Sequence, residues 1–284
     1  MKTLSTVNEI RSAVDIIKSE GKKIGFVPTM GFLHSGHLSL IKESKKKTDI
    51  TIVSVFVNPT QFAPNEDFSS YPRDFNRDAK VLEDAGVDYL FYPSADEIYP
   101  ANYQTYVEVT DITKIIEGEF RPTHYKGVTT VIAILFNCIN PDFAFFGQKD
   151  AQQSAVIKRM VKDLKYNIEI IVCPIIRESD GLAMSSRNIY LNTHEREKAL
   201  IINASLKQAE EIILSGERNA VLIIKKINNN FIKESSIHVN YLRIVDADSF
   251  KEVQILQPGK DYYILIAAKV GSTRLIDNNL IHIK

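Results

Sequence analysis

A ten-residue run near the amino terminus carries two histidines and two glycines in a pattern suited to phosphate chemistry. It spans residues 28–37, reads PTMGFLHSGH and directly follows a short apolar stretch. Glycine lets a backbone approach a ligand closely, and the free N–H groups at a helix start favour phosphate oxygens. His34 and His37 are three residues apart and therefore share one face of a helix that begins there. Two such imidazoles predict a site that stabilises charge while a phosphorus–oxygen bond breaks.

A second run, FGQKDAQQ at residues 146–153, also follows an apolar stretch and opens a helical pattern. Lys149 is a compact cation that can neutralise phosphate charge. Asp150 can cap the helix or contact a ribose hydroxyl, and Gln153, one turn further on, can bind a polar substrate. In isolation, a solvated Lys-Asp turn explains this run better. Two phosphate-type loops at the ends of successive strands favour a binding site.

Two further runs carry polar groups that fit the same chemistry. The run MSSR at residues 184–187 offers two hydroxyls and a guanidinium for an oxyanion, although a helix cap with a surface arginine has the same composition. Gln61, in NPTQF at the end of an apolar run, can both donate and accept a hydrogen bond. For the loops at 71–74 and 121–125, a structural and a functional role are both open.

The elements that must position these residues alternate between helix and strand over roughly the first 175 residues. Thr6 and Glu9 form a capping-box pair, apolar residues then recur at helical spacing, and Gly21 ends the helix. Apolar runs of strand length lie at 24–27, 50–57, 89–92, 143–146 and 168–173. Helical patterns between them lie around 38–41 and at 74–85, 128–139 and 151–164. This alternation predicts a doubly wound α/β sheet.

The pattern changes near residue 176. Two long helical patterns, at 193–215 and 219–234, precede strand-like runs at 239–246, 262–269 and 274–283. Helices followed by strands indicate a separate α+β unit. We therefore predict a domain boundary near 175/176.

Composition and charge exclude several classes of protein. The 35 basic and 35 acidic side chains cancel, which argues against a nucleic-acid or anionic-membrane binder, because those partners attract a basic excess. Cys138 and Cys173 lie far apart in apolar runs, so we expect buried thiols rather than a disulfide or zinc site. The sequence shows no signal-peptide or membrane-spanning pattern, which predicts a cytoplasmic protein. It also has no HExxH, CxxC, P-loop or GxGxxG pattern, so dinucleotide oxidoreduction has no support.

Taken in order, the runs PTMGFLHSGH, NPTQF, YPRDF, RPTHYKGV, FGQKDAQQ and DGLAMSSRN resemble the motifs of the pantothenate synthetases, or pantoate–β-alanine ligases. The closing GSTRLIDN extends the resemblance over essentially the whole chain. That family belongs to the nucleotidyltransferases with a HIGH motif, here HSGH at residues 34–37. The resemblance implies a Rossmann-like nucleotide-binding domain over 1–175 and a smaller α+β domain over 176–284 that covers the active site. It also implies a homodimer.

The resemblance further implies a reaction in two steps. The carboxylate of (R)-pantoate attacks the α-phosphate of ATP and gives pantoyl adenylate and pyrophosphate. The amine of β-alanine then attacks the adenylate and gives pantothenate and AMP. ATP is thus a substrate, and Mg²⁺ is expected with it, held largely by phosphates and water. Neither a nucleic acid nor a membrane is an implied partner.

Carried over by position, the resemblance makes His37 the family's active-site residue, with His34 and Lys149 beside it in the chemistry. Gln61 and Gln153 would bind pantoate, and Gln61 would also lie near β-alanine. The residues implied to contact ATP are Met30, Gly31, Phe32, Leu33, His34, Ser35, Gly36, His37, Gly147, Gln148, Lys149, Asp150, Ile176, Met184, Ser185, Ser186 and Arg187. No metal ligand is implied. Adenylation needs positioning and charge neutralisation more than a protein nucleophile, and these side chains supply both.

One position departs from the family pattern. Relatives commonly carry Lys where this chain has Ile134, within the apolar run 131–136. We expect Ile134 to be a core residue and a lysine there to be destabilising, because no carboxylate partner is evident. Two rival functions stay open: a nucleotidylyltransferase that stops after AMP transfer, and a catalytically inactive binding protein. The paired glutamines count against the first, and His34, His37 and Lys149 count against the second.

Overall fold

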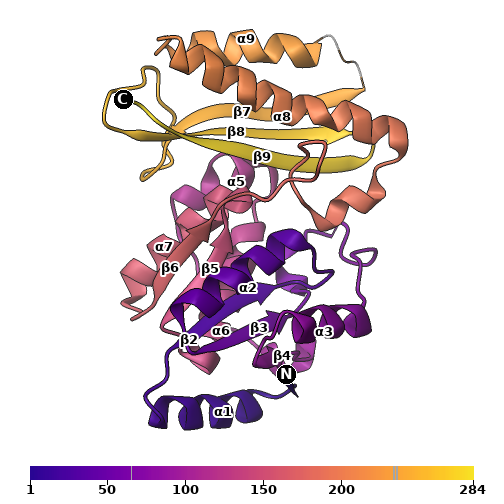
Figure 1. Ribbon diagram of the computed structural model, residues 1–284, viewed down its shortest axis with the longest axis vertical. Coiled ribbons are helices and arrows are strands. Elements are labelled where there is room, and N and C mark those ends of the chain that lie inside the picture. Colours follow the sequence, from indigo (N-terminus) through magenta and orange to yellow (C-terminus); the bar gives the residue numbers. More distant parts are fainter. Residues whose placement is uncertain (65, 233, 235) are drawn as a thin grey trace. The chain divides into compact units, whose positions relative to one another are not determined.

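The computed structural model describes residues 1–64, 66–232, 234 and 236–284. Their internal contacts divide them into two compact units, which can be followed by colour in Figure 1. The first comprises Met1–Gln148 and Gln152–Pro174, and the second comprises Ile175–Lys284 together with the short segment Lys149–Ala151. Each unit contains a sheet and a hydrophobic core of its own.

The first unit contains a six-stranded sheet in the order β1-β4-β3-β2-β5-β6, in which every neighbouring pair is parallel. Parallel neighbours need crossover connections, and helices supply them. The strands are β1 (Lys2–Leu4), β2 (Ile24–Thr29), β3 (Ile50–Val55), β4 (Tyr89–Phe91), β5 (Phe143–Gly147) and β6 (Glu169–Cys173). The longer helices are α1 (Val7–Ser19), α2 (Ser35–Lys47), α3 (Phe75–Asp84), α6 (His124–Ile139) and α7 (Ala151–Leu164). The shorter turns are η1 (Pro59–Gln61), α4 (Ala95–Ile98), η2 (Ile112–Lys114), α5 (Glu117–Phe120) and η3 (Gln148–Asp150).

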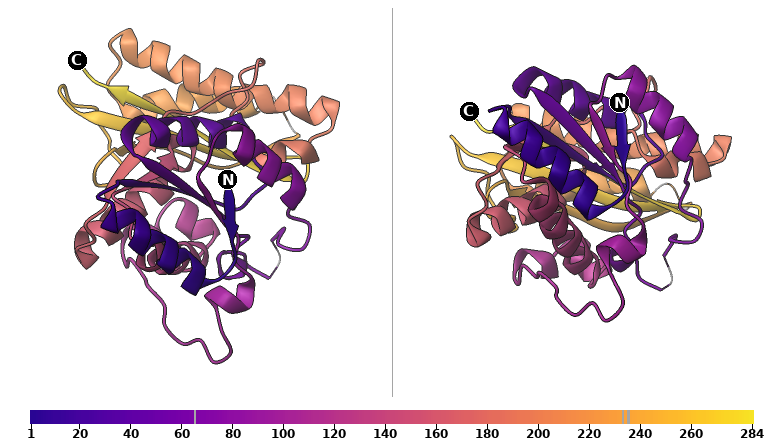
Figure 2. Two further views of the ribbon diagram at one scale, coloured as in Figure 1. Left: turned by 60° about the horizontal axis from the view of Figure 1, so that its bottom comes forward. Right: turned by 90° about the horizontal axis from the view of Figure 1, so that it is seen from below.

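Helices cover both faces of this sheet (Figure 2). Successive side chains of a strand point to opposite faces, and in β2 Phe26 packs with α1 and α6 while Val27 packs with α2 and α3. Ile52 and Val53 of β3 divide between the same two cores. A strand buried on both faces reads as a continuous apolar run, which is why the sequence indicates these strands. The predicted Rossmann-like doubly wound α/β class is confirmed.

The central strand β2 extends beyond its predicted end, through Pro28 to Thr29. A proline lacks the N–H that a central strand donates, so the sequence predicted a stop there. The Thr29 carbonyl accepts from the N–H of Phe56 at 3.0 Å, on the β3 side, so the backbone of Pro28 faces β5 instead. Along the described strands β5 pairs with β2 only at Gly25 and Phe26, and the missing N–H therefore interrupts no ladder.

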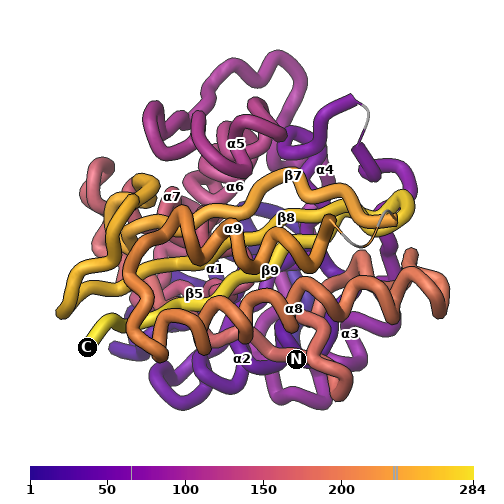
Figure 3. Tube along the Cα trace, turned by 90° about the horizontal axis from the view of Figure 1, so that it is seen from above, coloured from indigo at the N-terminus to yellow at the C-terminus, as the bar shows by residue number. Residues whose placement is uncertain are grey.

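The second unit packs two helices on a three-stranded antiparallel sheet of order β7-β8-β9. Its elements are η4 (Ser186–Tyr190), α8 (Thr193–Leu214), α9 (Ala220–Ile232), β7 (Ile237–Asp246), β8 (Asp261–Val270) and β9 (Thr273–His282). The helices α8 and α9 run side by side along the sheet and share its core (Figure 3). This confirms the predicted α+β region. The assignment of 1–175 to nucleotide binding and of 176–284 to covering the site stays a prediction.

Three local features differ from expectation. The strand β1 is three residues long, too short for a periodic signal. The helix α6 begins at His124, earlier than the predicted 128, because its first turn is polar. Ile134 is only partly buried, whereas Ala133 and Leu135 are 4% and 2% exposed. The expectation of a core residue at 134 is therefore met only in part. In the described part of the chain, no helix combines the length and hydropathy needed to span a membrane.

Candidate active site

The strand order brings the ends of β2 and β5 together. These strands are neighbours in the sheet, although β3 and β4 lie between them in the sequence. The direction in which strands are added reverses at this point, and open α/β sheets bind ligands outside the carboxyl ends of their strands at such a reversal. The histidine run at 30–37 follows β2, while Gly147 and Gln148 end β5 and begin η3. This edge is therefore the candidate active site of the first unit.

His34 and His37 lie together at the start of α2. His34 is the N-cap residue, and its Nδ1 accepts the N–H of Gly36 at 3.2 Å. His37 reaches back one turn, and its Nδ1 accepts the N–H of His34 at 3.3 Å. The centroids of the two rings are 4.1 Å apart. The rings thus share one face of the helix, as their spacing predicts.

These contacts fix the tautomer of both rings. A backbone N–H donates only to an unprotonated ring nitrogen, so the proton of each neutral imidazole is on Nε2. Each ring then provides an Nε2–H donor. The first turn of α2 has no acidic residue, so the positive end of the helix is not neutralised by its own side chains. Donors and positive potential together suit a phosphate group.

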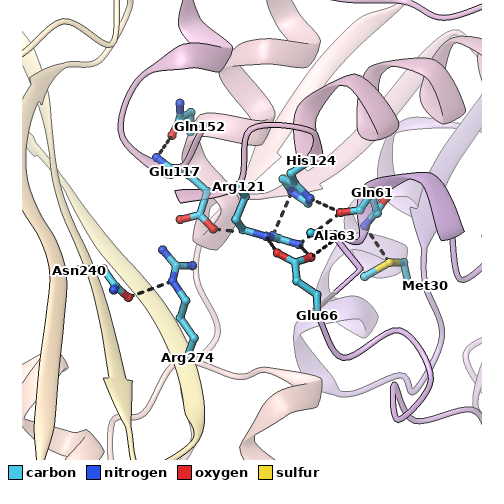
Figure 4. A network of polar contacts seen from close by, with 10 residues as sticks. All are labelled: Met30, Gln61, Ala63, Glu66, Glu117, Arg121, His124, Gln152, Asn240 and Arg274. Atoms are coloured by element: carbon cyan, nitrogen blue, oxygen red, sulfur yellow. Dashed lines mark hydrogen bonds and ion pairs between the residues drawn. The ribbon is translucent and has the colours of Figure 1, made fainter. Parts of the chain in front are cut away.

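Gln61 is buried in a single amide orientation (Figure 4). Its Oε1 accepts from Asn58 Nδ2 at 3.1 Å, and its Nε2 donates to the sulfur of Met30 at 2.9 Å. Asn58 is itself oriented, because Tyr99 Oη donates to its Oδ1 at 2.8 Å and its Nδ2 also donates to the Gly127 carbonyl at 3.1 Å. Burial raises the pKa of Tyr99 to about 12, so its hydroxyl keeps the donated proton. Gln61 consequently presents its NH₂ group, rather than its oxygen, beside the histidine run.

A charged cluster holds the backbone of Gln61 from the other side (Figure 4). His124 Nδ1 donates to the Gln61 carbonyl at 3.0 Å, and Arg121 Nη2 donates to the same oxygen at 3.4 Å. Arg121 Nε also pairs with Glu66 at 2.6 Å. Burial by itself would raise the pKa of Glu66, but the hydrogen bond and charge of Arg121 hold it below its ordinary value. The loop 121–125 therefore has a structural role in holding a predicted substrate residue.

His124 is neutral in the folded protein. Because its Nδ1 carries the proton donated to Gln61, its Nε2 is the acceptor, and Arg121 Nη1 lies 3.3 Å from it. Burial, followed by the Arg121 charge, lowers the pKa of His124 to about 4.

In the second unit, a hairpin holds Ile176 and Met184 side by side. The N–H of Met184 donates to the Ile176 carbonyl at 3.0 Å, and Gly181 turns the chain with a φ of +95°. Ser185 Oγ accepts the N–H of Arg187 at 3.3 Å and caps η4. The cap considered as the structural alternative for this run is thus present, and the ATP role of these residues stays a prediction.

The backbone of Lys149 is fixed within the second unit. Asn278 Nδ2 donates to the Lys149 carbonyl at 2.9 Å. The preceding residue, Asp277, forms a bidentate ion pair with Arg177 at 2.6 and 3.0 Å. The GSTRLIDN run at 271–278 therefore connects the hairpin with Lys149.

The predicted residues divide between the two units. The first unit holds 30–37, Gln61, Gly147, Gln148 and Gln153, and the second holds Lys149, Asp150, Ile176 and 184–187. Several residues that hold these positions do not appear among the residues predicted from the sequence, namely Asn58, Asp78, Tyr99, Arg177, Asp277 and Asn278. Most of their contacts join segments far apart in the chain, so the spacing of residues along the sequence does not predict them.

Gln152, directly before the predicted substrate residue Gln153, has a structural role that its position in the sequence does not indicate. It is 5% exposed, and its side chain accepts the N–H of Glu117 at 3.0 Å and donates to the carbonyls of Ile112 and Ile115, both at 2.8 Å. The sequence predicts its neighbour Gln153 as the substrate residue, and helical periodicity does not distinguish the two glutamines. The structure assigns Gln152 to support of the 112–117 segment, and the substrate role of Gln153 stays a prediction.

The donor set beside the histidine run is imidazole, amide and thioether. Magnesium prefers oxygen ligands, so these groups do not fit a Mg²⁺ site. Among the described residues, no group of three or more His, Cys, Asp and Glu side chains is placed to hold a metal ion.

The fold defines a class of protein, the Rossmann-like α/β proteins, and the histidine pair lies at a helix start where such folds bind ligands. The chain matches the family model described as "Pantoate-beta-alanine ligase" over residues 2–280. It belongs to the pantoate–β-alanine ligase family, whose reaction is the ATP-dependent formation of pantothenate.

Two curated relatives named pantothenate synthetase match the chain over nearly its full length. The one from Acetivibrio thermocellus is 50% identical over 283 residues, covering 100% of both chains. The one from Thermoanaerobacter sp. is 54% identical over 274 residues, covering 96% of both.

Solved structures of the family share the fold. Pantothenate synthetase from Thermus thermophilus aligns with a TM-score of 0.92 and 39% identity, over 98% of this chain and 99% of that one. Pantoate-beta-alanine ligase from Francisella tularensis, solved in complex with "Beta-gamma ATP and Beta-alanine", aligns with a TM-score of 0.79 and 37% identity, over 99% and 97%.

Proposed function

We propose that this chain joins (R)-pantoate to β-alanine through a pantoyl-adenylate intermediate, with ATP as the substrate that activates the carboxylate. The observation that carries the proposal is the pair His34 and His37, oriented as Nε2–H donors where the strand order reverses. The family supports the overall reaction, and the Francisella tularensis relative, solved with "Beta-gamma ATP and Beta-alanine", supports the two substrates.

The first step is attack at the α-phosphorus of ATP. A carboxylate oxygen of pantoate forms the new bond, and the bond to pyrophosphate breaks with its electron pair going to the pyrophosphate oxygen. The Nε2–H groups of His34 and His37 donate to the departing pyrophosphate, and Lys149 neutralises part of its charge. Donors that are already oriented lose little to reorganisation during the reaction.

Pantoate is oriented by amide groups. Gln61, whose oxygen is occupied by Asn58, donates from Nε2 to a hydroxyl or carboxylate of pantoate. Gln153 contributes a second amide. The remaining ATP contacts come from 30–33, Ser35, Gly36, Gly147, Gln148, Asp150, Ile176 and 184–187. In the second step the β-alanine amine attacks the acyl carbon and passes a proton to solvent, and the bond from that carbon to the phosphate oxygen breaks with its electron pair going to AMP.

We further propose a cytoplasmic homodimer in which Mg²⁺ enters with ATP, held by phosphate oxygens and water. The resemblance supports the dimer and the magnesium, and the biosynthetic reaction of the family supports the location. Analytical ultracentrifugation tests the dimer.

Isotope transfer tests the adenylate route. Labelled pyrophosphate should exchange into ATP when pantoate is present and β-alanine is absent. Pantoate labelled with heavy oxygen in its carboxylate should pass one labelled oxygen to AMP. Formation of ADP would contradict the adenylate route. AMP transfer without amide formation would support the nucleotidylyltransferase alternative, and no turnover would support the binding protein.

A further inference from the structure

The turn between β2 and α2 has an unusual backbone conformation. Gly31 and Phe32 both have positive φ, +81° and +50°. Glycine adopts such angles freely, but for an aromatic residue they are uncommon and persist where surrounding groups hold them. This turn, residues 31–33, ends directly before His34, so a change in the turn passes to the histidine pair.

A carboxylate on α3 holds this turn. Asp78 Oδ2 accepts the N–H of Phe32 at 2.6 Å, and its Oδ1 accepts the N–H of Leu33 at 2.8 Å. The Asp78 side chain is 2% exposed. A Cβ atom at Gly31 would lie 2.9 Å from Asp78 Oδ2, so the glycine leaves room for the carboxylate.

Arg77 holds the same turn from a second direction. Its Nη2 donates to the carbonyl of Leu33 at 2.7 Å, and its guanidinium lies 4.8 Å from the centre of the Phe32 ring. Its Nη1 is 3.4 Å from Asp78 Oδ1. Burial raises the pKa of Asp78, while the two backbone N–H groups and the Arg77 charge favour its ionised form. Two successive residues of α3 thus fix two successive residues of the turn.

We propose that Asp78 is a positioning residue of the adenylation step, which fixes the turn at 31–33 so that His34 and His37 meet the departing pyrophosphate. The inference rests on the proposed function of the histidine pair. Asp78 acts through the backbone rather than on the substrate, because both of its oxygens are engaged by N–H groups of the turn. Misplacement of catalytic groups by about 1 Å can cost about 10²-fold in rate.

The turn needs two acceptors side by side, which an ionised carboxylate supplies. Asp78→Asn keeps the size of the side chain but places an NH₂ group against one of the two N–H groups. Asp142 offers a matched control, because its Oδ2 accepts the N–H of Ile24 at 2.7 Å, at the opposite end of β2. Asp142→Asn therefore removes a similar contact away from the turn.

The two full-length variants are compared with the parent protein in two half-reactions. Exchange of labelled pyrophosphate into ATP, dependent on pantoate, measures adenylation. Aminolysis of supplied pantoyl adenylate by β-alanine measures the second step. We expect Asp78→Asn to slow exchange by about 10- to 100-fold and to leave aminolysis nearly unchanged, whereas Asp142→Asn slows neither selectively.

Two outcomes for Asp78→Asn overturn the inference: unchanged exchange, or an equal loss in both half-reactions, which a merely structural role would give. If Asp78→Asn does not fold, Arg77→Met tests the inference instead. This variant removes the contacts to Leu33 and Phe32 and keeps an unbranched side chain. Arg77→Met must then slow exchange selectively. If the parent protein shows no pantoate-dependent exchange, the proposed function fails rather than this inference.

Discussion

The side chain of Lys149 extends from a backbone whose carbonyl is fixed by Asn278 at 2.9 Å. A lysine whose backbone is held in place needs little rearrangement of the protein to bring its ammonium group to a phosphate. We expect Lys149→Ala to slow pyrophosphate exchange by about 10²–10³-fold with an unchanged melting temperature. Lys158→Ala, on the exposed surface of α7, is the matched control. Near-normal exchange in Lys149→Ala would mean that this lysine does not neutralise phosphate charge during adenylation.

His124 links the stability of the fold to pH. Its pKa is about 4 in the folded protein, against 6.5 as its ordinary value. Between these values the unfolded chain binds a proton that the folded chain does not, so the free energy of unfolding rises with pH by up to about 1.4 kcal/mol per unit from this group. Its stabilisation is therefore present above pH 6.5 and is lost as the pH falls toward 4.

Urea unfolding between pH 4 and 7 measures this contribution. We expect His124→Asn to flatten the dependence of the unfolding free energy on pH. His194→Asn, at an exposed histidine, should leave the dependence as in the parent protein. Equal slopes for both variants would mean that His124 binds its proton equally well in the folded and unfolded chains, which contradicts a lowered pKa.

At the scale of elements, α6 approaches η1 so closely that a glycine is required at their contact. A Cβ atom at Gly127 would lie 2.4 Å from the Thr60 carbonyl oxygen and 2.6 Å from the Cα of Gln61. Both are backbone atoms, so Gly127→Ala must displace η1 together with Gln61.

We expect Gly127→Ala to raise the KM for pantoate by about tenfold, since a contact of one amide to a substrate is worth about 1–1.5 kcal/mol. The KM for ATP should change much less. Steady-state kinetics with each substrate varied gives both constants, and Lys126→Ala, on the exposed side of α6, is the control. A change confined to ATP would contradict the placement of pantoate beside Gln61.

The elements could be predicted because burial on two faces leaves apolar runs in the sequence, as at 50–57. The histidine pair could be predicted because its contacts are local and one turn of helix decides them. The role of Asp78 could not be predicted, because a polar residue in an amphipathic helix normally faces solvent. Leu82, one turn further on, does mark the buried face of α3. The apolar run at 131–136 predicts Ile134 as a core residue, but periodicity does not show that α6 leaves this position at the edge of the core.

At the scale of the whole molecule, the chain enters the second unit twice. The segment Lys149–Ala151 belongs to that unit by its contacts, although it lies between β5 and α7 in the sequence. A chain shortened after Pro174 would therefore lose Asn278 and with it a bond that fixes Lys149. The first unit should not be tested alone for the role of this lysine.

The six-stranded sheet is unevenly joined along its width. β2 and β3 pair over six positions and β5 and β6 over five, but β2 and β5 pair at only two among the described strands. This narrow seam separates the group β1-β4-β3-β2 from the pair β5-β6, and the candidate site lies at one end of it. Local opening is easiest where few backbone bonds must break.

The seam predicts where the sheet opens locally. Without ligand, the amide hydrogens of β5 near the site should exchange with solvent faster than those of β3, because β3 pairs with β2 over six positions and β5 pairs with β2 at only two. A nucleotide that contacts the loops after β2 and β5 would act as a clamp across the seam and slow this exchange. Hydrogen–deuterium exchange with and without ATP measures the effect. The sheet therefore has its fewest backbone pairings between β2 and β5, the two strands whose following loops a bound nucleotide would connect.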